Sequence, residues 1–185
     1  MSTQLTPPAP GAIAVGSFTQ ARKHHKSYDA VLTLEDPGQR DGLRVRDGEQ
    51  LILNFEDCDD ASLGYKVATW ANMIEALRFC RLHSNGSLLI HCQAGVGRSA
   101  AVALMLIAHR LGRGHEEQAV ADLLAIRPEA TPNLVAIDLA DRILGTGGSL
   151  LSALRASEAA NPAKLQARAN RLRYALENPG LFAKA

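Results

Sequence analysis

The sequence predicts one α/β domain in which a mostly parallel central sheet of four to five strands is flanked by helices. Short apolar runs alternate along the chain with longer segments whose apolar residues recur every three to four positions. This alternation is typical of parallel sheets, because a crossover helix usually joins neighbouring parallel strands. A chain of 185 residues that is 46% hydrophobic can bury one sizeable core.

Strands are expected where short apolar runs are bounded by turn residues. They cover residues 12–15, 29–36, 50–55 and 87–90. The second run ends at Pro37 and Gly38, a turn-forming pair, and the last is wholly apolar, as in strands buried inside a parallel sheet. Residues 1–11, which are rich in proline, are expected to form an extended N-terminal segment.

Helices are expected where the apolar residues follow a helical period. They cover residues 65–83, 99–111, 115–127, 150–158 and 162–177, with a further helix after residue 131. Thr131 and Pro132 predict the N-cap and first helical position of that further helix. The glycine-rich stretch 145–149 interrupts the pattern. We therefore expect a domain at residues 12–145 and a helical C-terminal tail at residues 146–185.

Composition excludes several classes of function. With 20 Lys and Arg against 19 Asp and Glu, the net charge of +1 argues against binding nucleic acid or a membrane surface. The longest apolar run, residues 100–108, is about half of what a membrane span needs. Cys58, Cys80 and Cys92 are odd in number and irregularly spaced, which fits neither a disulfide framework nor a zinc site. We expect a cytoplasmic protein without a signal peptide.

The stretch HCQAGVGRS, residues 91–99, joins the last expected strand to an apolar helix. Gly95 and Gly97 permit backbone angles that would let consecutive N–H groups face inward. Such a turn at a helix N-terminus is an anion-binding concavity that suits a phosphate dianion. The same dipoles would favour a thiolate at Cys92, so this cysteine is the expected nucleophile.

The neighbours of Cys92 complete a site for phosphoryl transfer that needs no metal and no cofactor. Arg98 can hold two phosphate oxygens with its planar guanidinium, and Ser99 can donate a hydrogen bond to the sulfur when it leaves. His91 is expected to order the loop rather than to transfer protons. The expected phosphate-binding residues are Gln93, Ala94, Gly95, Val96, Gly97 and Arg98.

HCQAGVGRS resembles the motif H-C-x-x-G-x-x-R-S/T of the cysteine-dependent protein tyrosine phosphatase superfamily. The chain length is similar to that of its compact, dual-specificity-like members, and the resemblance covers about residues 12–144. It implies hydrolysis of phosphotyrosine in a protein or peptide, possible dual specificity, and a phosphocysteine intermediate. Two alternatives stay open: a phosphatase for small molecules or phospholipids, and a catalytically idle phospho-binding module.

The resemblance also implies a general acid about 30 to 35 residues before the cysteine. Asp57, Asp59 and Asp60 lie 35, 33 and 32 residues before Cys92, on a loop after an expected strand. We favour Asp57, because its sequence context FED is similar to the aromatic-x-Asp pattern of the acid loop. Asp60 is the alternative acid, and at least one of the three is expected to cap a helix instead.

Two further features keep more than one interpretation. Asn133 follows Pro132, as in dual-specificity enzymes. It either braces the loop at residues 91–99, called the phosphate loop below, or occupies the first turn of a helix. Cys58 and Cys80 either trap an oxidised Cys92 as a disulfide or are buried thiols, which is the better-supported reading. The sequence does not determine the oligomeric state.

Overall fold

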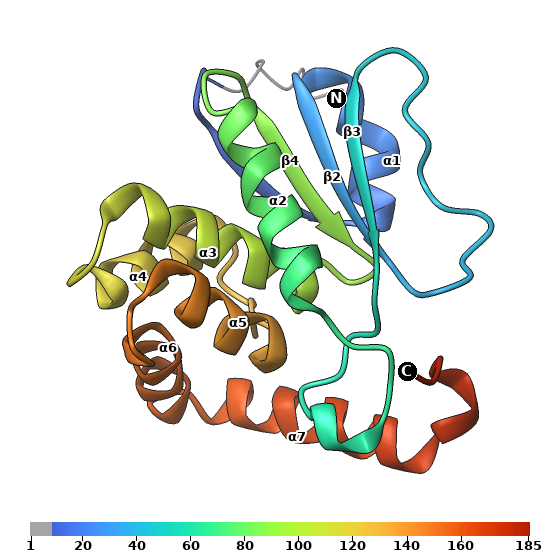
Figure 1. The fold of residues 1–185 in the computed structure, drawn as a ribbon, viewed down its shortest axis with the longest axis vertical. Helices are drawn as coiled ribbons and strands as arrows, with labels where there is room; N and C mark the ends of the chain where they lie inside the picture. The colour runs from blue at the N-terminus through green and yellow to red at the C-terminus, as the bar shows by residue number, and fades with distance from the viewer. Residues whose placement is uncertain (1–8) are drawn as a thin grey trace, which may run out of the picture.

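In the computed structural model, which describes residues 9–185, the centre is a four-stranded sheet with every strand parallel to its neighbours (Figure 1). The strands are β1 (Ile13–Ser17), β2 (Ala30–Glu35), β3 (Glu49–Asn54) and β4 (Leu88–Cys92), in the order β1-β4-β2-β3. The predicted α/β fold is therefore confirmed, with four strands. Most of the expected N-terminal segment lies outside the described residues.

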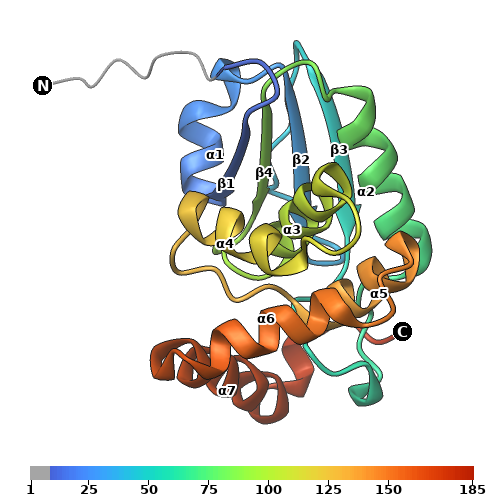
Figure 2. The ribbon, with the colours of Figure 1, turned by 90° about the vertical axis from the view of Figure 1, so that its left-hand side faces the viewer.

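Helices cover both faces of the sheet (Figures 1 and 2). On one face, α1 (Phe18–His24) packs its Ala21 against Val31 and Leu89. On the other, the main core joins the sheet to the helices that follow. These are α2 (Trp70–Leu82), α3 (Arg98–Leu111), α4 (Glu116–Ile126), α5 (Leu134–Leu144) and α6 (Ser149–Ala159).

Helix α3 is the centre of this main core. Every residue from Arg98 to Ala108 is buried, because the helix is apolar nearly all round and sits between the sheet and the outer helices. Four alanines in that stretch, at positions 100, 101, 103 and 108, allow close packing. The helix begins directly after the HCQAGVGRS loop, so burial of α3 fixes one end of that loop.

The C-terminal strap, defined here as residues 162–185, lies across the carboxyl ends of the strands (Figure 2). It consists of α7 (Pro162–Glu177), a 3-10 turn (Pro179–Leu181) and a short end segment. Asn161 caps α7 and Pro162 occupies its first turn, so this helix has the predicted bounds. Two other 3-10 turns, His25–Ser27 and Ala61–Leu63, lie in loops.

The helix predicted from residue 65 begins only at Trp70, so that start was wrong. Thr69 and Asn72 form a capping box, which fixes the first turn there. The backbone of Lys66 instead accepts from Glu56 N–H and donates to the Ala183 carbonyl. Tertiary pairing with the strap therefore keeps the segment before Thr69 extended.

The predicted N-cap at Thr131 was also wrong, because the cap of α5 is Asn133. The Asn133 side-chain oxygen accepts from the Ala136 N–H at 3.0 Å, and the helix starts at Leu134. Thr131 N–H donates to the Val96 carbonyl at 2.9 Å instead. The residues just before α5 are thus used to support the loop around Cys92.

Helix α1 was not predicted, although the sequence carries a signal for it. Ser17 and Gln20 form a capping box, in which each side chain accepts from the other residue's backbone N–H. Within residues 9–185, no helix is long and apolar enough to span a bilayer.

Candidate active site

The loop between β4 and α3 is held from outside through its carbonyl groups. Each carbonyl from residue 93 to residue 97 accepts a hydrogen bond from another part of the chain, at 2.9–3.4 Å. The donors are Phe18 N–H to Gln93, the Arg127 side chain to Ala94 and Gly95, Thr131 N–H to Val96, and Asn133 N–H to Gly97.

This arrangement determines where the N–H groups of the loop point. In a planar trans peptide, the N–H of the next residue points opposite to the carbonyl. With the carbonyls of residues 93–97 turned outward, the N–H groups of residues 94–98 face the inside of the loop. The Gly95 N–H lies 3.2 Å from Cys92 Sγ, which agrees with that direction. The result is a concave set of donors at the N-terminus of α3.

Gly95 is required by both its conformation and its surroundings. Its φ of +77° is in the left-handed region that side chains disfavour. A Cβ there would also lie 2.5 Å from the Gly16 carbonyl carbon of β1. At Gly97, a Cβ would overlap the Asp57 carboxylate. The two glycines therefore let the loop approach β1 on one side and the acid loop (residues 56–60) on the other.

Cys92 lies at the base of this concavity, where 1% of its surface is exposed. Its Sγ is 3.2 Å from Ser99 Oγ, in addition to the Gly95 N–H contact. Two polar groups, one of them the Gly95 backbone N–H donor, therefore face the sulfur. Ser99, on the first turn of α3, is thus within reach of the sulfur, as the expected role requires.

The other two thiols are free and buried apart from this base. Cys80 belongs to the main core, where burial raises its pKa to about 12. Cys58 packs with Tyr65 and Ala175, and burial raises the pKa of its thiol as well. Burial and the raised pKa keep Cys58 and Cys80 as unreactive thiols at neutral pH.

Arg98 is buried and turned toward two carboxylates. One terminal nitrogen, Nη1, donates to the Phe55 carbonyl at 2.7 Å and pairs with Asp36 at 2.8 Å. Burial opposes the charge on Arg98, but Asp57, Cys92 and Asp36 outweigh it and raise the pKa of the guanidinium. Its Nε lies 4.0 Å from the nearer Asp57 oxygen and makes no hydrogen bond. A buried, charged group with a free N–H is suited to an anion.

His91 supports the loop from below. Its Nε2 lies 2.9 Å from Thr33 Oγ1 on the neighbouring strand β2. Burial lowers the pKa of His91 to about 4, so the ring is neutral at physiological pH. A neutral ring bonded to the sheet suits a structural role better than proton transfer at pH 7.

The three candidate acids have different surroundings, and only one reaches the phosphate loop. Asp57 lies over Gly97 and beside Arg98. Asp59 is a structural carboxylate that accepts from Leu134 N–H at 2.9 Å and pairs with two arginines of the strap. Asp60 caps the 3-10 turn that follows it, accepting from Ser62 N–H at 2.8 Å. These contacts favour Asp57 as the acid.

Asn133 joins the acid loop to the phosphate loop. Its Nδ2 donates to Asp57 Oδ1 and to the Cys58 carbonyl, each at 3.0 Å, while its own N–H donates to the Gly97 carbonyl. Asn133 is therefore both a brace and a helix cap, so the two readings of the sequence are compatible.

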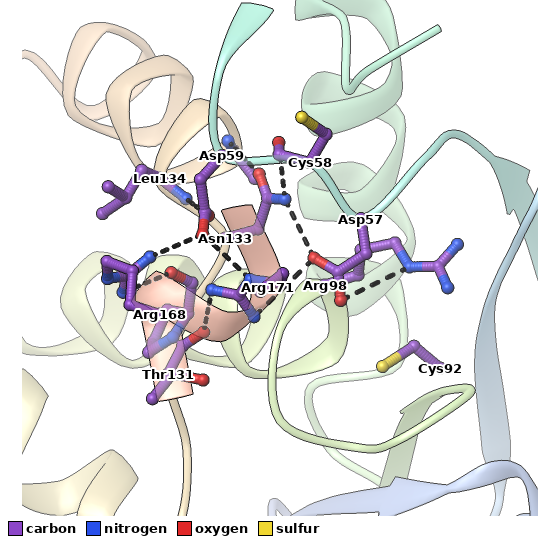
Figure 3. Close-up of polar contacts among 12 residues, drawn as sticks. Asp57, Cys58, Asp59, Cys92, Arg98, Thr131, Asn133, Leu134, Arg168 and Arg171 are labelled. Carbon is purple, nitrogen blue, oxygen red and sulfur yellow. Dashed lines mark hydrogen bonds and ion pairs between the residues drawn. The ribbon is translucent and has the colours of Figure 1, made fainter. Parts of the chain in front are cut away.

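The strap contributes two arginines to the same region (Figure 3). Arg171 donates to Asp59 at 2.8 Å and to the Thr131 carbonyl at 2.9 Å, and its Nη1 lies 3.9 Å from Asp57 Oδ1. Arg168 pairs with Asp59 at 3.0 Å and with Glu158. Asp57 therefore stands between two guanidinium groups, one from α3 and one from α7.

Sequence reasoning missed Asp36, Arg127 and Arg171. Asp36 and Arg127 carried a weak signal, because each is the last residue of an expected strand or helix, where the chain enters a loop that can reach a site. Arg171 carried none. It belongs to a run of basic residues on an amphipathic helix, a pattern typical of a solvated surface.

A cavity of about 440 Å³ opens beside the phosphate loop. Its walls come from three parts of the chain: the loop, the carboxylates that face it, and the strap. The lining residues are Asp36, Glu56, Asp57, Gln93, Ala94, Arg98, Arg171, Tyr174, Leu181 and Phe182.

The chain is similar in sequence to one protein family and in fold to several solved structures. A sequence model described as protein-tyrosine phosphatase matches residues 20–129. Among solved structures, human DUSP28 is 18% identical with a TM-score of 0.57, covering 76% of this chain and 96% of its own. DUSP15 is 21% identical with a TM-score of 0.56, covering 83% and 94%. PTPMT1, solved in complex with PI(5)P, is 17% identical with a TM-score of 0.53, covering 73% and 91%. No curated protein sequence matches the chain.

Proposed function

Because the chain belongs to the protein-tyrosine phosphatase family, we propose that it hydrolyses phosphotyrosine through a cysteinyl-phosphate intermediate, with dual specificity open to test. The observation that carries this proposal is the loop from Cys92 to Arg98. The carbonyls of residues 93–97 accept hydrogen bonds from outside the loop, the Gly95 N–H lies 3.2 Å from the Cys92 sulfur, and the buried Arg98 stands beside it. These are the donors that an in-line transfer of phosphate requires.

The first step forms a sulfur–phosphorus bond. The Cys92 thiolate attacks phosphorus, and the bond from phosphorus to the phenolic oxygen breaks. The N–H groups of the loop and Arg98 balance the charge on the equatorial oxygens. Asp57 gives its proton to the leaving oxygen, which departs as a neutral phenol.

The second step releases phosphate. Asp57, now ionised, takes a proton from a water whose oxygen attacks the phosphorus of the intermediate. The sulfur–phosphorus bond breaks and returns its electron pair to Cys92. Ser99, at 3.2 Å, donates a hydrogen bond to the departing sulfur. Phosphate leaves, and the protonated acid is restored.

The charges around the cavity favour a substrate with one phosphate. The variable loop positions Gln93, Ala94 and Val96 carry no lysine. Besides Arg98, the cavity lining contributes one cationic side chain, Arg171, which is already bonded to Asp59, and it also carries the carboxyl groups of Asp36, Glu56 and Asp57. A phosphorylated protein or peptide therefore suits the cavity better than a highly charged inositol phosphate. A reducing, cytoplasmic setting agrees with three free thiols.

The test is phosphate release from p-nitrophenyl phosphate, from a phosphotyrosine peptide and from a phospholipid that carries a phosphate monoester, with chelator present. We expect turnover by wild type, none by Cys92→Ser, and near-normal turnover by Cys80→Ser, the same change at a buried thiol away from the loop. Turnover that persists in Cys92→Ser would refute the cysteine mechanism. Folded, reduced wild type that binds the phosphopeptide without turnover would establish the idle binding module instead. Preference for a phospholipid over the peptide would establish the lipid alternative.

A further inference from the structure

The strap reaches the cavity with apolar side chains as well as with Arg171. Tyr174 on α7, Leu181 at the end of the last 3-10 turn and Phe182 line the same cavity as Gln93, Ala94 and Arg98. We call Tyr174, Leu181 and Phe182 together the wall. The family match ends at residue 129, so the wall lies outside it.

Hydrogen bonds on both sides of the wall hold its backbone in place beside the cavity. Before it, Arg171 is tied to Asp59 and to the Thr131 carbonyl. After it, the Ala183 N–H donates to Glu56 Oε1 at 2.7 Å, and the Ala183 carbonyl accepts from Lys66 N–H at 2.8 Å. Between these ties, Phe182 stacks on Tyr65 with 4.7 Å between ring centroids. The backbone that carries Leu181 is thus anchored on either side.

Two of the wall's side chains remain open to solvent. Leu181 is 68% exposed and Tyr174 is 53% exposed. Apolar surface at the edge of a cavity gains about 25 cal/mol for each Å² that a ligand covers. An aromatic ring gains more than an aliphatic group here, because it can also pack against the Tyr174 and Phe182 rings.

We propose that Tyr174, Leu181 and Phe182 form the surface that binds the phenyl ring of phosphotyrosine. The inference rests on the proposed function, since it assumes that the phosphate lies in the Cys92 loop. A phosphate in that loop directs its ester group into the cavity that the wall borders. Phosphotyrosine presents a ring there, whereas phosphoserine and phosphothreonine present at most a methyl group next to the ester carbon. The strap therefore selects aryl over alkyl phosphate esters.

The test compares two peptides of the same sequence, one with phosphotyrosine and one with phosphoserine. For Leu181→Ala and for Tyr174→Ala we expect the KM for phosphotyrosine to rise about five- to tenfold, with kcat within about twofold. The KM for phosphoserine and the inhibition constant of inorganic phosphate should not change. Leu176→Ala is the matched control, because Leu176 is a 56% exposed leucine of α7 that does not line the cavity.

A binding measurement separates this proposal from the proposed function. In a Cys92→Ser background, titration calorimetry with free phosphotyrosine and free phosphoserine reports on the wall without catalysis. Loss of phosphotyrosine affinity alone in Leu181→Ala supports the wall, whether or not wild type turns over. Equal losses for both amino acids would overturn it, because the strap would then act only on the fold. Tighter binding of both would also overturn it and identify the strap as an obstruction.

Discussion

The phosphate loop and the acid side of the cavity are built in opposite ways. The phosphate loop takes Cys92, Arg98 and Ser99 from one stretch of the chain between a strand and a helix. The acid side brings Asp57 together with Asn133 and Arg171, which follow it by 76 and 114 positions. A local turn brings the residues of the first together and distant donors then hold it, whereas only the complete tertiary fold brings the residues of the second together.

Because of this difference, the two halves of the site should tolerate different substitutions. The phosphate loop depends on residue type at every position, because its glycines and its arginine each fill a geometric requirement. The acid side depends on distances between segments, so a change far along the chain can displace Asp57 without touching phosphate. Substitutions in the phosphate loop should therefore reduce activity strongly toward every phosphate ester. Substitutions on the acid side should reduce activity less, and by an amount that depends on the leaving group.

The largest effect is expected for Arg98→Lys. The ammonium keeps the charge but cannot hold two oxygens at once, so kcat/KM should fall roughly 10³-fold for every phosphate ester. Steady-state kinetics with p-nitrophenyl phosphate measure the loss. Arg155→Lys, on the exposed face of α6, is the control and should behave as wild type. A loss of less than tenfold would mean that Arg98 is not a phosphate ligand.

Asp57→Asn should reduce kcat by about 10²-fold, because the leaving oxygen would depart without a proton. The loss should be greater for a phosphotyrosine peptide than for p-nitrophenyl phosphate, whose phenolate is the better leaving group. Asp60→Asn should leave kcat nearly unchanged, since asparagine caps a turn as well as aspartate does. The reverse result, a loss in Asp60→Asn alone, would transfer the acid role to Asp60.

Arg171→Lys should lower kcat about tenfold, with little change in KM. Lysine keeps the charge but loses the paired donors to Asp59 and Thr131, so Asp57 loses its position rather than its counter-charge. The loss should be greater for a phosphotyrosine peptide than for p-nitrophenyl phosphate, whose phenolate depends less on a well-placed acid. Arg173→Lys, two residues on and exposed, is the control. Equal losses for both substrates would leave Arg171 with a purely structural role.

The smallest effect is expected from the pH dependence of stability. The unfolded chain binds a proton at His91 near pH 6.5, whereas the native ring stays neutral until about pH 4. The stabilisation that the fold gains by keeping His91 neutral is complete above pH 6.5, and it is lost as the pH falls toward 4. Between pH 7 and 5.5 the free energy of unfolding should drop by about 1 kcal/mol. Urea unfolding at both pH values measures it, and His91→Asn should flatten the difference. A wild type equally stable at both would contradict the depressed pKa.

Sequence reasoning reached the fold because strand and helix periods are local properties. It misplaced two helix starts, and long-range contacts contribute to both. Residues 65–68 have an apolar pattern that fits a helix, but backbone pairing between Lys66 and Ala183 keeps them extended. Thr131 is a good cap by residue type, but its N–H donates to the Val96 carbonyl and holds it beside the loop, whereas the Asn133 side chain accepts from Ala136 N–H and caps α5.

The same limit applies to the candidate site. The residues of the phosphate loop could be predicted together, because seven consecutive positions carry the chemistry. Asp57, Asp59 and Asp60 are indistinguishable by spacing, and only their partners separate them. Arg171 could not be found, because nothing in a basic amphipathic helix indicates which arginine will meet a carboxylate more than 100 residues away.

The hydrogen bond between Glu56 and Ala183, which are 127 residues apart, also affects the kinetics of folding. Contacts between distant parts of a chain form late during folding, since the intervening loop must first be closed. A refolding molecule will therefore recover its helical signal before it recovers turnover. The interval between the two signals measures how long the last segment takes to reach the acid loop, and shortening the 145–149 link should change that interval more than it changes the finished enzyme.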